Sequence, residues 1–269
     1  MLCVHWNGVV VPLMWTLLDK KGNSNSVERI ALMQRLQKTF PDQRIERLLA
    51  DREFIGKEWI SWLIAENIPF VLRVKENMHV FNDRQAPAPL LRLAASLKVG
   101  ERLSLKGVWR LGASENEASP PVRIGIVPLK TKELLIVATS LASPKRALEL
   151  YRHRWKIESL FATLKTRGFN LESTNMTDPS KLSTLLTVLA LAAVIAVKCG
   201  ALAADGNPIR RKSHGRPTRS LAAYGRAFFN KTFAQNLAIK SSFCFTPFCS
   251  QNNPSTDSHG LNESGTLRI

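Results

Sequence analysis

Hydrophobic positions in the first part of the chain alternate between strand-like and helix-like spacings. Residues 4–18 are rich in Val, Trp and Leu around Asn7-Gly8, which predicts a two-stranded hairpin. From about Ser26 to Lys38 the apolar residues fall mostly on one side of a helix. The same reasoning predicts two strands and a helix between them, at Arg44–Ala50, Pro69–Lys75 and about Lys57–Glu66. Alternating strands and helices are typical of an α/β fold.

The middle of the chain has a different pattern. Residues 76–142 contain short apolar runs separated by polar, Pro or Gly residues, which predicts a β-rich region without a clear helix. Ser143 then offers an N-cap, Pro144 suits a first helical turn, and Gly168 offers a C-cap. We therefore expect one helix between them, with an apolar stripe made by Leu150, Ile157, Phe161 and Leu164.

An uncharged apolar tract covers residues 182–197. Asp178 can cap a helix there, Pro179 fits its first position, and Lys198 interrupts the tract. The tract is shorter than the roughly 20 residues that span a bilayer, so we predict a buried core helix and no membrane partner.

These patterns divide the chain into successive regions. Residues 1–75 are expected to form part of an α/β core, 76–142 a β-rich insertion, and 143–204 the rest of the core. Residues 205–240 are rich in Lys and Arg, and either a loop against DNA phosphates or a solvated linker would explain them. The polar, Gly-, Pro- and Ser-containing tail, 241–269, is expected to be disordered.

Charge narrows the classes of partner. The chain has 38 Lys and Arg against 21 Asp and Glu, a net charge of +17, which favours a polyanion such as nucleic acid. The four cysteines form no CxxC pair, so neither a zinc site nor a disulfide framework is expected. No basic region precedes the first apolar run, so a cytoplasmic location is expected rather than secretion.

The segment YRHRWKIESLFATLK carries four polar side chains at helical spacing. Tyr151, Arg154, Glu158 and Lys165 are separated by 3, 4 and 7 residues, which places them on one face of a helix. A carboxylate beside two cations and a phenol suits a site that holds both a metal ion and a phosphate backbone. Taken alone, Glu158 would more often be a solvated helix acid that pairs with Arg154.

The spacing Y-x2-R-x3-E-x6-K resembles the YREK box of bacterial insertion-sequence transposases of the DDE superfamily. GNSNS at Gly22–Ser26, LLADREFIG at Leu48–Gly56 and FVLRVKEN at Phe70–Asn77 resemble the same family, in the same order. The resemblance implies a ribonuclease-H-like mixed sheet flanked by helices and interrupted by a β-rich insertion. It also implies cut-and-paste transposition of DNA near the bacterial nucleoid, by a homodimer in a synaptic complex with terminal inverted repeats and target DNA.

The resemblance also implies roles for individual residues. Asp51 and Glu158 would be catalytic ligands of Mg²⁺, with Mn²⁺ as an alternative. Contacts to DNA phosphates are expected from the remaining box residues and from two strand-end cations, namely Tyr151, Arg154, Lys165, Arg52 and Lys75. Asp51 could instead be a plain strand-end turn residue. For Trp109, burial is a better expectation than base stacking.

The family's first catalytic Asp lies on a strand that precedes the hairpin, and the chain starts at that hairpin. Asp19, the only acid before Glu28, is better explained as a loop residue. We therefore expect a truncated transposase that does not transpose DNA alone, with an exposed edge on the neighbouring strand. A non-catalytic DNA-binding remnant that interferes with an intact copy, or a basic structural binder of nucleic acid, would be the alternatives.

Overall fold

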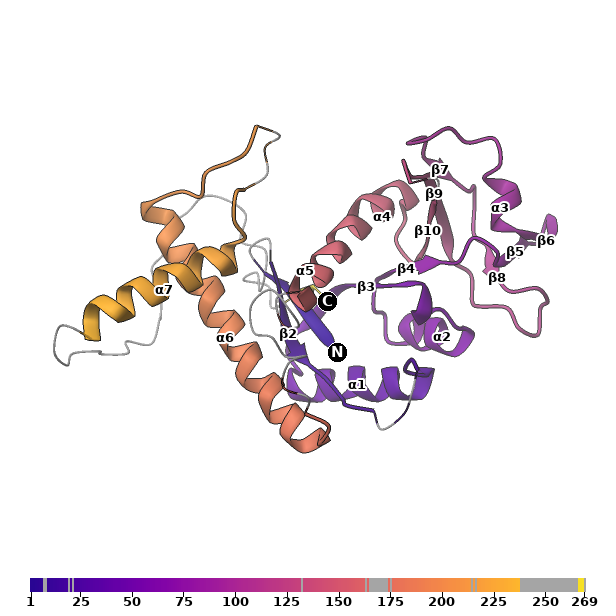
Figure 1. The fold of residues 1–269 in the computed structure, drawn as a ribbon. Coiled ribbons are helices and arrows are strands. Elements are labelled where there is room, and N and C mark those ends of the chain that lie inside the picture. Colours follow the sequence, from indigo (N-terminus) through magenta and orange to yellow (C-terminus); the bar gives the residue numbers. More distant parts are fainter. Residues whose placement is uncertain are drawn as a thin grey trace.

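The computed structural model describes residues 1–6, 9–18, 20, 22–131, 133–162, 164, 174, 176–213, 215, 217–237 and 266–268. These residues form a mixed sheet with helices packed on it, and a helical pair that extends from one side (Figure 1). The predicted turn at Asn7-Gly8, the loop acid Asp19 and the C-cap at Gly168 lie outside the described residues.

The main sheet has six strands in the order β11-β3-β4-β10-β9-β7. Their bounds are Thr266–Arg268, Arg44–Ala50, Phe70–Val74, Leu134–Thr139, Arg123–Pro128 and Leu103–Ser104. Strand β3 runs parallel to β4, whereas β10 is antiparallel to both β4 and β9. The sheet is therefore mixed, and the predicted α/β class with helices flanking such a sheet is confirmed.

Helices cover both faces of this sheet. Helices α1 (Ser26–Thr39) and α2 (Lys57–Ala65) pack on one face. Helix α4 (Pro144–Tyr151) packs on the opposite face, where Leu148 meets Val71 and Val137. Alternate residues of β4 enter the two cores, as expected for a strand buried on both sides. The two helices and two strands predicted between Ser26 and Lys75 are confirmed with boundaries within a residue or two.

The β-rich region is divided between two sheets. Strands β7, β9 and β10 extend the main sheet. Strands β5 (His79–Asn82), β6 (Gln85–Pro89) and β8 (Arg110–Leu111) form a separate three-stranded sheet. A short helix, α3 (Leu90–Leu93), follows β6; the sequence pattern did not predict it, because a single turn leaves no helical periodicity to detect.

The predicted hairpin consists of β1 (Leu2–Trp6) and β2 (Val9–Met14), which pair as a separate antiparallel sheet. It packs against α5 (Lys156–Ala162) and α6 (Pro179–Gly206) through Cys3, Leu160 and Leu189. Asp178 caps α6, and Pro179 occupies its first turn, as predicted.

Helix α6 is longer than the apolar tract that predicted it. It has 28 residues, and the mean hydropathy of its most apolar 18-residue window is 2.4, so by length and composition it could cross a membrane. Within that window 39% of the residues are buried in the protein. The prediction of a buried helix is confirmed for one face only: Leu189, Ala193 and Val197 are buried, whereas Val188, Leu191 and Leu202 are exposed.

The basic region contains a helix that composition did not predict. Helix α7 (Leu221–Leu237) packs closely against α6. A Cβ atom added to Gly200 or Gly225 would overlap the backbone of the other helix, so glycine permits the close crossing. The sequence analysis interpreted residues 205–240 by their overall charge, although Leu221–Leu237 contains only two basic residues, Arg226 and Lys231.

The edge of β3 is paired by a segment from the tail. In contrast to the expectation of disorder for 241–269, Thr266–Arg268 form β11 and run parallel to β3. Residues 238–265 lie outside the described residues. An unpaired strand edge offers hydrogen-bonding groups to any extended segment within reach, and this pairing cannot be deduced from the tail's composition.

Candidate functional site

The box residues lie on a helical segment that changes its hydrogen-bonding pattern. Ser143 caps α4 and Pro144 occupies its first turn, as predicted. A 3₁₀ turn, η2 (Arg152–Trp155), then separates α4 from α5. The prediction of one uninterrupted α-helix was therefore wrong. Tyr151 directly precedes this turn and Arg154 lies in it, and both contact Asp51, which helix propensity does not report.

Asp51 directly follows β3, as predicted for a residue at the carboxyl end of a strand. Its Oδ1 accepts a hydrogen bond from the backbone N–H of Arg52 at 2.8 Å and caps the short 3₁₀ turn η1 (Arg52–Phe54). Lys75 follows the end of β4, the parallel neighbour of β3. Arg52 and Lys75 are both exposed at the same edge of the sheet.

Asp51 and the box residues converge although a hundred positions separate them in the sequence. The Tyr151 hydroxyl donates a hydrogen bond to Asp51 Oδ1 over 3.2 Å. Arg154 lies between two carboxylates: its Nη1 is 3.5 Å from Asp51 Oδ2 and its Nη2 is 2.7 Å from Glu158 Oε1. The structure therefore brings Asp51, Tyr151, Arg154 and Glu158 into one cluster, the acid–arginine cluster.

Burial distinguishes the members of this cluster. Tyr151 is only 6% exposed, and its ring packs in the core between α4 and the sheet. Burial is the largest cause that raises the pKa of its hydroxyl, and the nearby Asp51 charge raises it further. The hydroxyl faces Asp51, so in this structure Tyr151 orients a carboxylate; its predicted contact with phosphate stays a prediction.

The donor set of the cluster fits a hard divalent cation. Two carboxylates face one guanidinium, and their side chains remain 32% and 43% exposed at Asp51 and Glu158, so water and ions can reach them. Mg²⁺ prefers carboxylate oxygens and retains several waters, so few protein ligands suffice. Among the described residues no group of three or more Asp, Glu, His or Cys side chains is gathered for a metal ion.

The other predicted residues have different surroundings. Lys165 lies outside the described residues. Trp109 is buried, and its indole N–H donates to the Lys106 carbonyl at 3.1 Å, so the expectation of an ordinary buried aromatic is confirmed. Trp155, which the sequence analysis did not single out, is 68% exposed on η2 beside Arg154. It lies on a 3₁₀ turn that helix periodicity did not predict.

Arg29 positions the turn that follows Asp51, and sequence reasoning missed it. Its Nε donates to Ser24 Oγ at 3.1 Å, and its Nη2 donates to the Glu53 carbonyl at 2.9 Å. Its guanidinium also lies 4.7 Å from the centre of the Phe54 ring. Arg29 thus joins the loop before α1 to η1. Its place within a helix that already showed a clear apolar face gave no signal of this role.

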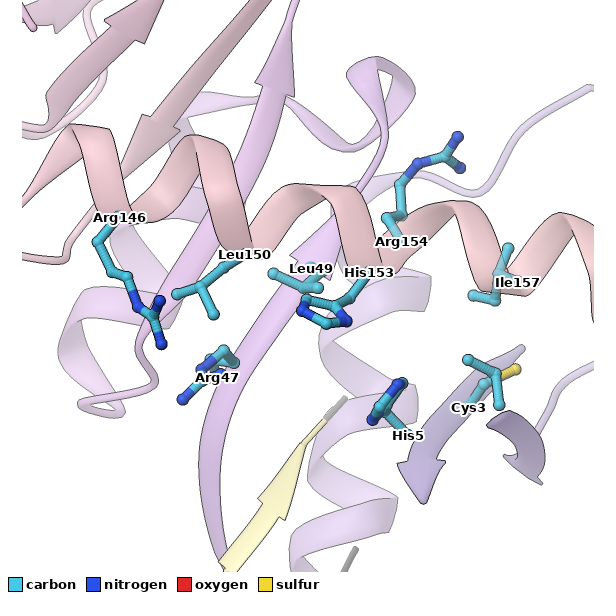
Figure 2. Close-up of a pocket in the computed structure, with 10 residues that line it drawn as sticks. Cys3, His5, Arg47, Leu49, Arg146, Leu150, His153, Arg154 and Ile157 are labelled. Atoms are coloured by element: carbon cyan, nitrogen blue, oxygen red, sulfur yellow. The ribbon is translucent and has the colours of Figure 1, made fainter. Parts of the chain in front are cut away.

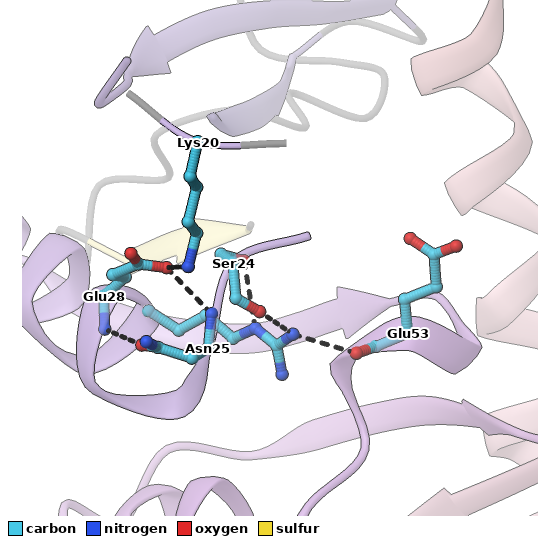
Figure 3. Close-up of polar contacts among 6 residues, drawn as sticks. Lys20, Ser24, Asn25, Glu28 and Glu53 are labelled. Carbon is cyan, nitrogen blue, oxygen red and sulfur yellow. Dashed lines mark hydrogen bonds and ion pairs between the residues drawn. The ribbon is translucent and has the colours of Figure 1, made fainter. Parts of the chain in front are cut away.

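The loop before α1 is itself fixed by a capping box. Asn25 Oδ1 accepts from the Glu28 N–H, and Glu28 Oε2 accepts from the Asn25 N–H at 2.8 Å (Figure 3). Lys20 Nζ lies 2.8 Å from the same carboxylate oxygen. The GNSNS segment and the turn after Asp51 therefore form one connected polar framework.

Comparison with known proteins defines the class of this chain. The family described as "Transposase DDE domain" matches residues 8–195. The chain therefore belongs to the transposase DDE domain family, whose members act in DNA transposition. A search of curated proteins found no match.

One solved structure that matches is the cryo-EM structure of piggyBac transposase synaptic complex with hairpin DNA. The sequence identity is 12% and the TM-score is 0.40. The match covers 90% of this chain and 49% of that chain, so this chain spans about half the length of that protein.

Proposed function

We propose that this chain carries the DNA-binding and metal-binding cluster of an insertion-sequence transposase, an enzyme of metal-dependent DNA strand cleavage and transfer, and that the chain does not complete transposition alone. The observation that supports this most is the convergence of Asp51 and Glu158 on Arg154 within a chain of the transposase DDE domain family. Phosphodiester chemistry needs carboxylates for a divalent ion and cations for the phosphate, and the cluster contains both.

DNA would approach along the exposed cationic side of the cluster. Arg154 provides a planar guanidinium suited to a phosphate, and Arg52 and Lys75 lie at the adjacent strand ends. The exposed Trp155 offers a ring on which an unpaired base can stack. With a net charge of +17, the chain would bind DNA largely through its backbone. Terminal inverted repeats and target DNA are the proposed partners, with a homodimer joining two ends.

Asp51 and Glu158 would hold Mg²⁺, or Mn²⁺ in its place. When bound, the ion would polarise the phosphate and activate the attacking oxygen. Tyr151 would keep Asp51 oriented through its hydroxyl, and Arg29 would hold the turn that follows Asp51. Arg154 would exchange part of its pairing with the two carboxylates for a phosphate oxygen when DNA binds.

Nicking of a supercoiled plasmid that carries an element end tests this function. The purified chain should nick it with Mg²⁺ or Mn²⁺ and not with excess chelator. The substitutions Asp51→Asn and Glu158→Gln should abolish nicking while leaving the DNA affinity within about twofold, since neither carboxylate attracts phosphate. A matched control is Glu133→Gln, which removes an exposed acid that pairs with Arg73 and is not a member of the cluster.

A second candidate function is DNA binding without cleavage. The contacts of Arg154 to both carboxylates favour it, because a guanidinium already neutralises the charge that a metal ion would neutralise. In that case nicking stays at background for all variants, while Arg154→Gln still weakens binding. Preference for terminal repeats over random DNA of equal length would then separate a transposase remnant from a general nucleic-acid binder.

A further inference from the structure

The basic segment between α6 and α7 forms a loop that is held by its own backbone contacts. Its described residues, 207–213, 215 and 217–220, connect the two helices (Figure 1). Arg211 and Pro217 pair in an antiparallel bridge, and the Thr218 N–H donates to the Arg210 carbonyl at 2.9 Å. The two arms of the loop therefore lie side by side.

This loop forms one wall of a groove on the far side of the hairpin. The groove has a volume of about 510 Å³ and lies between the loop, β2, α5, α6 and the start of α7. Ile209, Arg211, Pro217 and Arg219 of the loop line it. Since one water occupies about 30 Å³ of the liquid, the groove has room for more than a single phosphate group.

The cations that line the groove come from three separate elements. Lys156 comes from α5, Arg211 and Arg219 from the loop, and Arg226 from α7. None of the described residues that line it is acidic. We call this space the basic groove. Its concentration of positive charge favours an anionic ligand.

The rest of the lining indicates which part of an anion the basic groove suits. Val9, Leu160 and Val197 provide an aliphatic floor, and apolar surroundings strengthen the attraction between a cation and a phosphate. Leu221 and Ala222 of the first turn of α7 also border the groove, and the amino-terminal end of a helix favours negative charge. No described lining residue is aromatic, so the groove suits a phosphate backbone better than stacked bases.

The helical segment η2–α5 presents different side chains to the basic groove and to the acid–arginine cluster. Lys156 and Ser159 line the groove, whereas Glu158 pairs with Arg154. Lys156 Nζ lies 2.9 Å from His5 Nε2 on β1, and Figure 2 shows Arg154 pointing away from His5. A ligand in the groove would therefore be held separately from one at the cluster.

We propose that the basic groove is a second place at which this chain binds the phosphate backbone of duplex DNA, apart from the acid–arginine cluster. The proposal rests on DNA as the ligand of the proposed function. Arg211, Arg219 and Arg226 bind phosphate oxygens through their planar guanidinium groups, and Lys156 acts as a point charge. Backbone contacts do not depend on base sequence, so the groove holds and positions any duplex.

The salt dependence of DNA binding tests the groove. Each phosphate contact contributes about 0.9 to the slope of log affinity against log salt concentration. Replacing Arg211 and Arg219 together by Gln should remove about two contacts. Between about 50 and 200 mM salt, the affinity of this double variant should therefore fall about tenfold less than that of the unsubstituted chain. Anisotropy with a labelled duplex of random sequence, in the presence of chelator, measures both slopes.

A second double variant controls for the loss of net charge. Lys38→Gln combined with Arg92→Gln removes two exposed cations, on α1 and α3, that neither line the groove nor belong to the cluster, so the slope should stay unchanged. Arg219→Gln alone keeps the hydrogen bond from Arg211 Nη1 to the Gly215 carbonyl at 3.1 Å and should remove about one contact. Equal slopes in all these chains would overturn the proposal. Equal decreases in the two double variants would also overturn it, because net charge alone would explain them.

Hydrogen exchange separates duplex DNA from free phosphate as the ligand. Saturating duplex should protect amides in 209–213 and 217–226 of the unsubstituted chain and leave 57–65 unchanged, whereas pyrophosphate should protect neither. Protection by pyrophosphate, together with equal duplex affinity of the Arg211 and Arg219 double variant and the unsubstituted chain, would assign the groove to free phosphate and overturn the proposal.

Metal binding distinguishes a failure of the groove from a failure of the cluster. The anisotropy measurements contain chelator, so the absence of metal-dependent nicking would not alter their slopes. The double variant at Arg211 and Arg219 should bind Mn²⁺ as tightly as the unsubstituted chain, because Asp51 and Glu158 are not changed. Weaker Mn²⁺ binding by this variant would show that the substitutions disturb the cluster, and would overturn the assignment of a separate site.

Discussion

The hydroxyl of Tyr151 donates a hydrogen bond to Oδ1 of Asp51 over 3.2 Å, although the two residues are 100 positions apart. This bond joins the end of α4 to the end of β3, and the Arg154 contacts extend it to Glu158. Tyr151 and Arg154 of the box therefore contact Asp51 directly. Replacing a box residue should change the charge environment of the Asp51 carboxylate.

Alkaline conditions should expose the contribution of Tyr151. Burial raises the pKa of its hydroxyl in the folded chain above the value of about 10 expected in the unfolded chain. The stability that this group contributes is present below pH 10 and is lost as the pH rises further, because only the unfolded chain then releases the proton. The stability of Tyr151→Phe should fall less steeply between about pH 8 and pH 10.5.

Urea unfolding at about pH 8 and about pH 10.5 measures how much stability each chain loses between the two. Tyr224→Phe is the matched control, since the chain has two tyrosines and the Tyr224 hydroxyl donates to the Asn207 carbonyl far from the cluster. An identical loss of stability in the wild-type chain and in Tyr151→Phe would contradict the buried environment assigned to Tyr151.

Replacing Arg154 should have opposite effects on two ligands. Arg154→Gln leaves the Asp51 and Glu158 carboxylates without their shared cation, so Mn²⁺ affinity should rise roughly tenfold, about 1.4 kcal/mol. DNA affinity should fall. The slope of log affinity against log salt concentration should become shallower by about the amount that one phosphate contact contributes. Calorimetry with Mn²⁺ and anisotropy with labelled DNA at several salt concentrations measure these changes. A parallel loss of both affinities would indicate unfolding or a purely structural role.

The framework around Arg29 should stabilise the turn after Asp51. Arg29→Met keeps the apolar stem and removes the hydrogen bonds to Ser24 and Glu53, so the free energy of unfolding should fall by about 1–3 kcal/mol. Arg92→Met, an exposed substitution on α3, is the control and should change stability by less than about 0.5 kcal/mol. Equal denaturation midpoints for the two variants would show that the turn does not depend on Arg29.

The crossing of α6 and α7 should not tolerate a side chain. Gly200→Ala introduces a Cβ that overlaps the backbone at Leu221, and the helices must separate, at a cost of about 1–3 kcal/mol. Gly206→Ala makes the same chemical change, but its added Cβ meets no atom within 4 Å, so the free energy of unfolding should stay nearly unchanged. Limited proteolysis should cleave α7 faster in Gly200→Ala than in Gly206→Ala or in the unsubstituted chain. Equal cleavage rates would contradict this packing.

Local sequence signals were sufficient for much of the core and of the cluster. Periodicity located α1, β3, α2 and β4, and the caps at Ser143 and Asp178 started the predicted helices. The box spacing placed Tyr151, Arg154 and Glu158 together, because residues three or four positions apart lie on the same face of a helix. These features depend on residues close in sequence, so pattern and propensity report them.

Features that depend on distant partners were not predictable in the same way. The 3₁₀ turn η2, the role of Arg29, and the pairing of β11 with β3 arise from contacts between segments far apart in the chain. Helix α7 was missed because residues 205–240 were interpreted from their overall charge, although α7 itself carries only Arg226 and Lys231. Gly225 packs on α6, a contact that charge does not report. The order of strands in the main sheet likewise follows from tertiary packing.

Mn²⁺ binding to four matched chains tests most directly whether Asp51 and Glu158 form a metal site. Electron paramagnetic resonance of free Mn²⁺ should show saturable binding to the unsubstituted chain and to Glu133→Gln. In Asp51→Asn and in Glu158→Gln the affinity should fall at least about tenfold, because each loses a carboxylate ligand. Equal affinity in all four chains would contradict the metal site, and the contacts of Arg154 would then be structural ion pairs alone.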